Sequence, residues 1–107
     1  MPQFDVHRNI GRQRETIPFV VIVQSSLYND YRRRVVVPLV RKELLGSITD
    51  PSFNPTFTIE SIDVVLHPLE IVSMPTGQLG AWVGSLSAAG DQIIRAIDQL
   101  LSRAEPA

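Results

Sequence analysis

The sequence predicts an α+β fold in which an antiparallel sheet or small barrel packs on one C-terminal helix. Two short runs rich in β-branched residues, Phe19–Val23 and Val35–Val37, indicate buried strands, because each is too short for an ordinary helix. Other segments alternate apolar and polar residues, as half-buried strands do. Close to the C-terminus, apolar residues instead recur at intervals of three and four, which predicts an amphipathic helix.

Several segments of the chain have the pattern of strands. In chain order they are Gln3–His7, Phe19–Val23, Val35–Val37, Thr56–Glu60, Ile62–His67 and Glu70–Met74. Pro38 has no N–H to donate, so we expect it where its strand leaves the sheet or at a sheet edge. Arg41–Gly46 is expected to form a short helical turn that Gly46 ends. The glycine-rich segment Thr76–Gly84 is expected to be irregular.

The last element is expected to be a helix that Ser87 caps at its N-terminus. Its apolar stripe consists of Ala89, Ile93, Ile94, Ile97, Leu100, Leu101 and Ala104. Asp91 in the first turn and Arg103 in the last turn suit the helix dipole, and Pro106 prevents the helix from continuing. We expect Trp82 to cover the core between the last strand and this helix.

The composition is that of a globular protein with little net charge. At 107 residues and 11.9 kDa, residues 1–107 are expected to form one domain. A net charge of −1 gives no general attraction to nucleic acid or to anionic lipid. The absence of cysteine excludes disulfides, thiol catalysis and zinc–thiolate sites, and it fits a reducing cytoplasm. No secretory signal or membrane-spanning run is present, so we expect a soluble cytoplasmic protein without a membrane partner.

The sequence contains no recognisable catalytic motif. No nucleophile elbow, phosphate-binding loop or dinucleotide fingerprint occurs, and His7 and His67 stand in no metal-ligand spacing. We therefore expect no catalytic residue, no metal and no cofactor, and a protein that is not an enzyme. Tyr28, Tyr31 and Arg32–Arg34 stand together between two expected strands. These arginines suit a phosphate or an acidic segment of a partner, and the alternative is a solvated entry to the strand.

A series of short motifs runs nearly end to end through the chain. They are Gln3–Phe4, VQSSL (Val23–Leu27), RRVVVPL (Arg33–Leu39), Leu44–Leu45, NPTFTI (Asn54–Ile59), SMP (Ser73–Pro75), Leu86–Ser87 and the helical Ile93–Leu100. In these motifs and their order the sequence resembles the CcdB toxins of bacterial toxin–antitoxin modules. The resemblance implies a small antiparallel sheet with barrel-like curvature, a small inserted sheet, one C-terminal α-helix and a homodimer.

The resemblance also implies a function and partners. CcdB toxins poison DNA gyrase by wedging into its GyrA-type subunit and trapping the enzyme on cleaved DNA. The antitoxin CcdA wraps the toxin dimer and releases gyrase, and the two proteins together repress their operon. A CcdA-like antitoxin and the DNA gyrase A subunit are thus the expected partners, with DNA contacted only indirectly through the antitoxin complex.

The residues that match gyrase-contacting positions of the family are Leu27, Tyr28, Asp98, Leu101, Ser102, Arg103 and Ala104. Family toxins commonly end in an aromatic or small residue followed by Gly-Ile, whereas Ser102, Arg103 and Ala104 occupy this tip in the present chain. A buried anchor at the tip typically contributes much of the binding energy. A second hypothesis is therefore a non-poisoning homologue that keeps antitoxin binding and operon co-repression.

A third hypothesis is an endoribonuclease, because MazF-type toxins share this fold. Such an enzyme needs a basic residue and a hydroxyl or carboxylate that converge on the scissile phosphate. Arg14, Thr16 and Arg33 are the candidates for these roles, although no motif fixes them.

Overall fold

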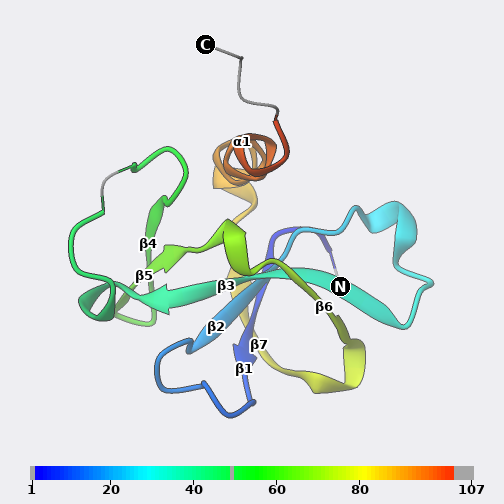
Figure 1. Cartoon of the computed structure of the whole chain (residues 1–107). Coiled ribbons are helices and arrows are strands. Elements are labelled where there is room, and N and C mark those ends of the chain that lie inside the picture. The colour runs from blue at the N-terminus through cyan, green and yellow to red at the C-terminus, as the bar shows by residue number, and fades with distance from the viewer. Residues whose placement is uncertain (1, 49, 103–107) are drawn as a thin grey trace.

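Over residues 2–48 and 50–102, which the computed structural model describes, seven strands form one curled antiparallel sheet and a single α-helix packs against it (Figure 1). The strands are β1 (Asp5–Asn9), β2 (Phe19–Ile22), β3 (Arg33–Arg41), β4 (Thr56–Ile59), β5 (Ile62–Leu66), β6 (Val72–Pro75) and β7 (Leu79–Ser85). The 3-10 helices are η1 (Ser26–Tyr28), η2 (Lys42–Leu44), η3 (Pro68–Glu70), η4 (Thr76–Gln78) and η5 (Ser87–Ala89), and the α-helix is α1 (Gly90–Leu101). The predicted fold class is confirmed.

The long strand β3 organises the sheet, because it has two different partners along one side. Its first part, Arg33–Val36, pairs with β6, and its last part, Leu39–Arg41, pairs with β5. The strand order is β4-β5-β3-β2-β1-β7, with β6 off this path. The inserted sheet expected from the family resemblance is the β4–β5 hairpin, which joins the main sheet through β5. The short helical turn expected at Arg41–Gly46 is present as the 3-10 helix η2, which lies within that segment.

Pro38 lies inside β3 rather than at a strand end or a sheet edge, so the prediction for this residue was wrong. It faces Val20 of β2 on one side. On the other side its carbonyl accepts the N–H of His67 at 3.1 Å. Pro38 stands there between two parts of β3, the part that pairs with β6 and the part that pairs with β5. The N–H and C=O of a strand residue point to the same side. The missing N–H therefore faces the gap between two partner strands, where no ladder hydrogen bond is lost.

The sheet is apolar on both faces. On the face covered by α1, Phe19 and Val21 of β2 pack with Ile93 and Ala96 of the helix, and all four are fully buried. Side chains of a strand alternate between faces, so the intervening residues of β2 point away from α1. These residues, Val20 and Ile22, form a second, smaller cluster with Val36 of β3, and Met74 and Leu79 pack against it. No helix in the described part of the chain is long and apolar enough to cross a membrane.

The helix begins two residues later than predicted, with Ala89 rather than Ser87 at the N-cap position. Ser87–Ala89 forms η5, and Ser87 does not cap α1; instead its own N–H donates to the Ser85 hydroxyl. Gly90, the first residue of α1, lies against the ring of Phe4, where an added Cβ would be only 2.7 Å from a ring carbon. The helix is described to Leu101. The predictions for residues 103, 104 and 106 fall outside the described residues.

The segment Thr76–Gly84 is ordered as η4 and most of β7, which corrects the prediction that it is irregular. β7 pairs with β1 across two register shifts. His7 Nδ1 lies 2.9 Å from the Gly80 carbonyl oxygen and donates to it, since a carbonyl only accepts. Trp82 is 60% exposed on this edge strand, so the prediction that it covers the core was also wrong.

Gly80→Ala is expected to destabilise the protein by about 1–3 kcal/mol, the usual cost of overpacking. A Cβ at Gly80 would stand 2.6 Å from the backbone carbonyl oxygen of Arg8, which cannot move away as a flexible side chain can. The matched control is Gly84→Ala on the same strand, where an added Cβ meets nothing within 4 Å. Urea unfolding of both variants checks this, and equal midpoints would contradict the close packing of β7 on β1.

Candidate functional site

The loop of residues 24–32, which we call the η1 loop, is held by its first residue, Gln24, and by Arg34 of the strand that follows it. Gln24 accepts the N–H of Val35 and donates to the carbonyl of Tyr28, each at 2.9 Å. Arg34 is only 5% exposed, and its guanidinium donates to the carbonyls of Asn29, Tyr31 and Arg33. These bonds fix the loop's backbone, although most of its side chains face solvent.

The N-terminal segment links the η1 loop to the start of α1. The Gln3 N–H donates to the Ser26 hydroxyl at 3.2 Å, and the Gln3 amide donates to the carbonyl of Val23 at 3.0 Å. The next residue, Phe4, packs on Gly90 and its carbonyl accepts the N–H of Leu86. Residues from three distant parts of the sequence therefore meet at this corner.

Leu27 and Leu101 are the two most exposed large hydrophobic residues in the described part of the chain. Leu27, in η1, is 85% exposed, and Leu101, at the end of α1, is 75% exposed. Tyr28 beside Leu27 is 53% exposed. Both leucines were among the positions identified from the family resemblance. Apolar side chains that stand this far into water are suited to contact another macromolecule.

The last turn of α1 carries the other predicted site residues. The N–H and hydroxyl of Ser102 both donate to the Asp98 carbonyl, at 2.8 and 2.6 Å, and Ser102 itself is extended. The helix therefore ends cleanly and presents Leu101 and the exposed Asp98. One residue along from Asp98, the Gln99 amide donates to the Ser52 hydroxyl at 3.1 Å, which anchors this turn to the loop before β4. Predicted contacts Arg103 and Ala104 lie outside the described residues.

The loop before β4 is itself ordered by a single carboxylate. An oxygen of Asp50 accepts the Ser52 hydroxyl at 2.7 Å and the backbone N–H groups of Ser52 and Phe53. The Ser52 hydroxyl and then the Phe53 N–H lower the pKa of this exposed carboxyl below its usual value, because they bind its charged form.

The predicted site residues that the structure describes lie in two groups, one on the η1 loop and one on the last turn of α1 (Figure 1).

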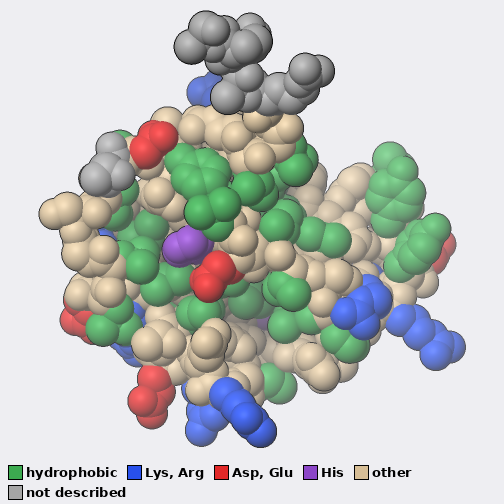
Figure 2. Space-filling model, in the orientation of Figure 1, with side chains coloured by type: hydrophobic (Ala, Val, Ile, Leu, Met, Phe, Trp, Pro, Cys, Tyr) green, Lys and Arg blue, Asp and Glu red, His purple; other side chains and the backbone are tan. Residues whose placement is uncertain are grey.

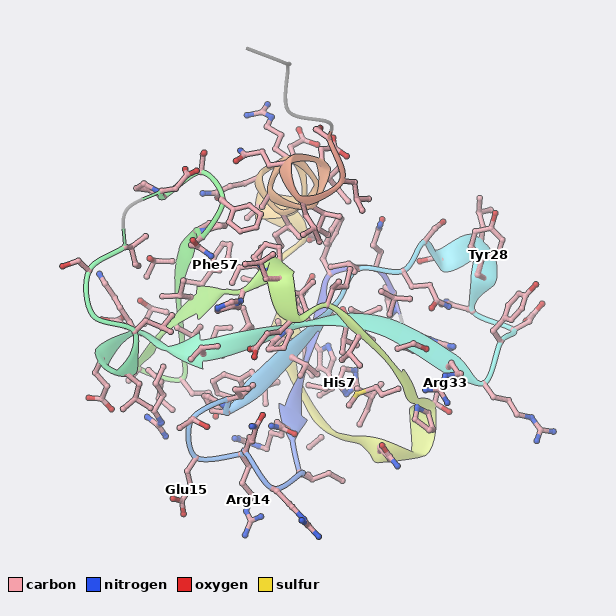
Figure 3. All side chains as sticks on the ribbon, viewed as in Figure 1. His7, Arg14, Glu15, Tyr28, Arg33 and Phe57 are labelled. Carbon is pink, nitrogen blue, oxygen red and sulfur yellow. The ribbon has the colours of Figure 1, made fainter. Side chains whose placement is uncertain are left out.

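The three candidate residues for RNA cleavage do not converge within the chain. The carbonyl of Thr16 accepts the N–H of Arg41 at the end of β3. Arg33 begins the same strand, which places it about 26 Å away at roughly 3.3 Å per residue. Arg14 donates to the carbonyl of Gly11 in its own loop, and Figure 3 shows Arg14 and Arg33 at separate places on the molecule.

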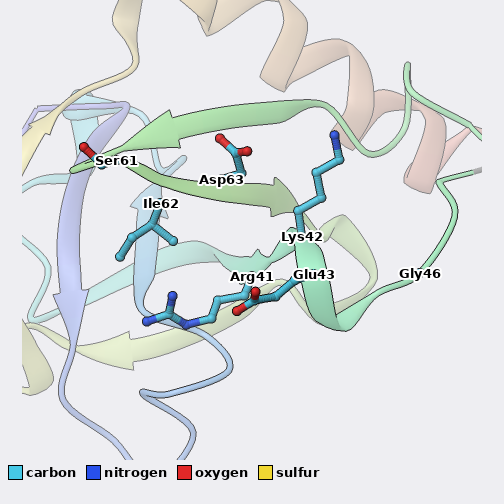
Figure 4. Close-up of a pocket in the computed structure, with 7 residues that line it drawn as sticks. All are labelled: Arg41, Lys42, Glu43, Gly46, Ser61, Ile62 and Asp63. Atoms are coloured by element: carbon cyan, nitrogen blue, oxygen red, sulfur yellow. The ribbon is translucent and has the colours of Figure 1, made fainter.

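A polar cavity between η2 and the start of β5 was not found from the sequence. Its volume is about 600 Å³. It is lined by Arg41, Lys42, Glu43, Gly46, Ser61, Ile62 and Asp63 (Figure 4). The two groups of lining residues come together only through the pairing of β3 with β5. Nothing in the local sequence signals that pairing.

The family model of the CcdB protein matches residues 3–102, which is nearly the whole chain. The chain belongs to the CcdB family. The family's motifs found in the sequence now have structural roles: VQSSL forms the first half of the η1 loop, and RRVVVPL supplies Arg34 and most of β3. A CcdB-family chain is the toxin of a toxin–antitoxin module.

Two solved structures share the fold of this CcdB-family chain. One is an endoribonuclease in complex with its cognate antitoxin from a mycobacterial species, with a TM-score of 0.72, 18% identity and 99% of both chains covered. The other is an endoribonuclease from a mycobacterial species, with a TM-score of 0.69 and 17% identity over 99% of this chain and 95% of that chain. At these identities the likeness shows the fold. A comparison with curated proteins found no match.

These two structures correct the prediction that the protein is not an enzyme. Both are endoribonucleases built on the same sheet and helix. The absence of a nucleophile elbow, a phosphate-binding loop and a dinucleotide fingerprint was therefore no argument against catalysis, because one fold can carry an activity that none of these motifs marks.

Proposed function

We propose that this CcdB-family toxin binds the A subunit of DNA gyrase and traps the enzyme on cleaved DNA. Leu27 and Tyr28 of the η1 loop and Asp98, Leu101 and Ser102 of α1 would form the contact surface. The observation that carries the proposal is the exposure of Leu27 and Leu101, at 85% and 75%.

The physical argument concerns what these side chains gain on binding. Burying a leucine against a partner contributes about 1.5–3 kcal/mol. The backbone of the η1 loop is already fixed by Gln24 and Arg34, so little conformational entropy is lost when Leu27 is buried. Asp98 and Ser102 stand beside Leu101 and supply polar groups for the rim of the contact.

A DNA-cleavage assay tests this proposal. Purified toxin is incubated with gyrase and supercoiled plasmid, and gyrase is then denatured with detergent. Linear plasmid that depends on both proteins is the expected result, since trapped gyrase holds both strands cut. The non-poisoning hypothesis expects no linear plasmid at any toxin concentration, together with retained binding to the antitoxin; that result would contradict the proposal.

We further propose that the toxin is a homodimer, and that the antitoxin wraps this dimer and connects it to operator DNA. Leu69, in the η3 turn that contacts α1, is 66% exposed and supports a self-association surface beside the helix. Light scattering during size-exclusion chromatography is expected to give twice the chain mass of 11.9 kDa. A single-chain mass at micromolar concentration would contradict the dimer.

RNA cleavage is the second candidate function, favoured by the fold shared with two endoribonucleases and by the polar cavity. In such a reaction a carboxylate takes the proton of a ribose 2′-hydroxyl, whose oxygen attacks the neighbouring phosphorus. The bond from phosphorus to the 5′-oxygen breaks, which leaves a 2′,3′-cyclic phosphate, and the 5′-oxygen takes up a proton from water to become a hydroxyl. In the cavity Asp63 or Glu43 is suited to accept that proton, and Arg41 and Lys42 to stabilise the phosphate charge. Incubation of single-stranded RNA with the wild type and with Arg41→Gln tests for RNA cleavage at this cavity. Intact RNA in both samples would contradict this candidate function.

A further inference from the structure

A second cavity lies between the η1 loop and the edge formed by β3 and β6. Its volume is about 410 Å³. It is lined by Gln24, Tyr28, Tyr31, Arg33, Val35 and Ser73. Figure 2 shows hydrophobic side chains close to Lys or Arg side chains at the right-hand edge of the molecule, where the η1 loop lies in Figure 1. An apolar hollow therefore stands next to positive charge.

Arg33 is held in a defined orientation at the rim of this cavity. Its Nε donates to the Ser73 hydroxyl and its Nη2 donates to the Ser73 carbonyl, both at 2.8 Å. Its Nη1 makes no hydrogen bond or ion pair with any residue that the structure describes. One edge of the guanidinium is thus fixed to β6, and the other remains available for an anion.

The apolar walls are equally constrained. The rings of Tyr28 and Tyr31 meet edge to face, with centroids 6.1 Å apart and planes at 68°. Between the tyrosines and β3, the amide of Gln24 uses both its oxygen and its nitrogen on backbone groups. The cavity therefore offers ring surface and the side chain of Val35, with the charge concentrated at Arg33.

We propose that this cavity binds an acidic segment of a partner polypeptide. An aromatic or aliphatic side chain of the segment enters beside Tyr31 and Val35, and a neighbouring carboxylate pairs with Arg33. Tyrosine and arginine are among the residue types that most often anchor protein interfaces. The adjacent Arg32 is exposed and adds positive charge for a segment with more than one carboxylate.

The charge distribution favours a polypeptide over nucleic acid. Single strands bind along grooves with many positive charges. In this protein the exposed carboxylate of Asp30 precedes Arg32 and Arg33 in the loop, and the chain as a whole carries a net charge of −1. The cavity shares Tyr28 with the proposed gyrase contacts, but Tyr31 and Arg33, which the proposal uses, are not among them, so a test at these two residues is separate from the test of gyrase binding.

The test uses small probes and NMR spectra of the ¹⁵N-labelled full chain. N-acetyl-tryptophan carries an aromatic ring and a carboxylate, whereas N-acetyl-tryptophanamide has the same ring without the charge. We expect N-acetyl-tryptophan to shift the amides of Tyr31, Val35 and Ser73 in a saturable way, with at least fivefold weaker binding of the amide. Uridine monophosphate is the probe for a nucleotide site.

Two variants and one control make the result specific. Arg33→Gln is expected to abolish the preference for the carboxylate, and Tyr31→Ala is expected to weaken both tryptophan probes. Arg14→Gln removes an exposed arginine far from the cavity and is expected to bind as the wild type does. Dispersed spectra of each variant establish that it is folded. The proposal is overturned by equal affinity for the two tryptophan probes, by a preference that survives Arg33→Gln, by tighter binding of uridine monophosphate, or by no shift at all.

Discussion

The double variant Leu27→Asp/Leu101→Asp is expected to lose at least 100-fold in affinity for the gyrase A subunit and to stop arresting growth. Two buried leucines contribute about 3–6 kcal/mol to a contact, and each 1.4 kcal/mol is a factor of ten in the dissociation constant. An aspartate in their place would also lose its hydration in the interface. The fold should be unaffected, because both side chains are largely exposed. Isothermal titration calorimetry with the purified gyrase A subunit measures the effect.

The matched control for this variant is Leu44→Asp. Leu44 is a leucine of η2 that is 54% exposed and is not part of the proposed contact surface. Its replacement is expected to leave the affinity within about twofold. Wild-type affinity in the double variant, or an equal loss in the control, would show that Leu27 and Leu101 are not the anchors.

Ile93→Ala is expected to destabilise the protein by about 2–5 kcal/mol, as truncation of a fully buried side chain does when the site cannot collapse. Ile93 is 0% exposed and joins α1 to the main core cluster on the sheet. Removing its side chain leaves a cavity that Phe19 and Val21 of the rigid sheet cannot fill. Guanidinium chloride unfolding followed by circular dichroism measures the change in the free energy of unfolding.

Ile94→Ala provides the control on the same helix. Ile94 is one residue farther along and 36% exposed, so its truncation removes less buried surface. A loss of less than about 1.5 kcal/mol is expected. If the two variants were equally unstable, the orientation assigned to α1 on the sheet would be wrong.

Much of the fold could be predicted because its signals are local. The apolar run Phe19–Val23 became β2, and the alternating segment Thr56–Glu60 became β4. The segment with apolar residues at three- and four-residue intervals became α1. Pro38 and β7 could not be predicted in this way. The position of Pro38 is permitted by a change of partner strands along β3, and β7 is ordered by pairing with β1, far away in the sequence.

The candidate site likewise contains some features that the sequence could indicate and others that only the folded structure shows. Leu27 and Leu101 were identified from the family resemblance, and the structure adds that they are exposed. The role of Arg34 was missed, because a run of three arginines does not indicate which one is buried. Both cavities were also missed, since each is assembled from segments that meet only through strand pairing, as Arg33 and Ser73 do.

Expression of the toxin without its antitoxin, with DNA and RNA recovered from the same cells, tests the proposed gyrase poisoning most directly. We predict growth arrest with chromosomal breaks that carry covalently attached gyrase, while transcripts remain intact. Growth arrest with unbroken DNA and cleaved transcripts would contradict gyrase poisoning and would assign the activity to RNA cleavage instead.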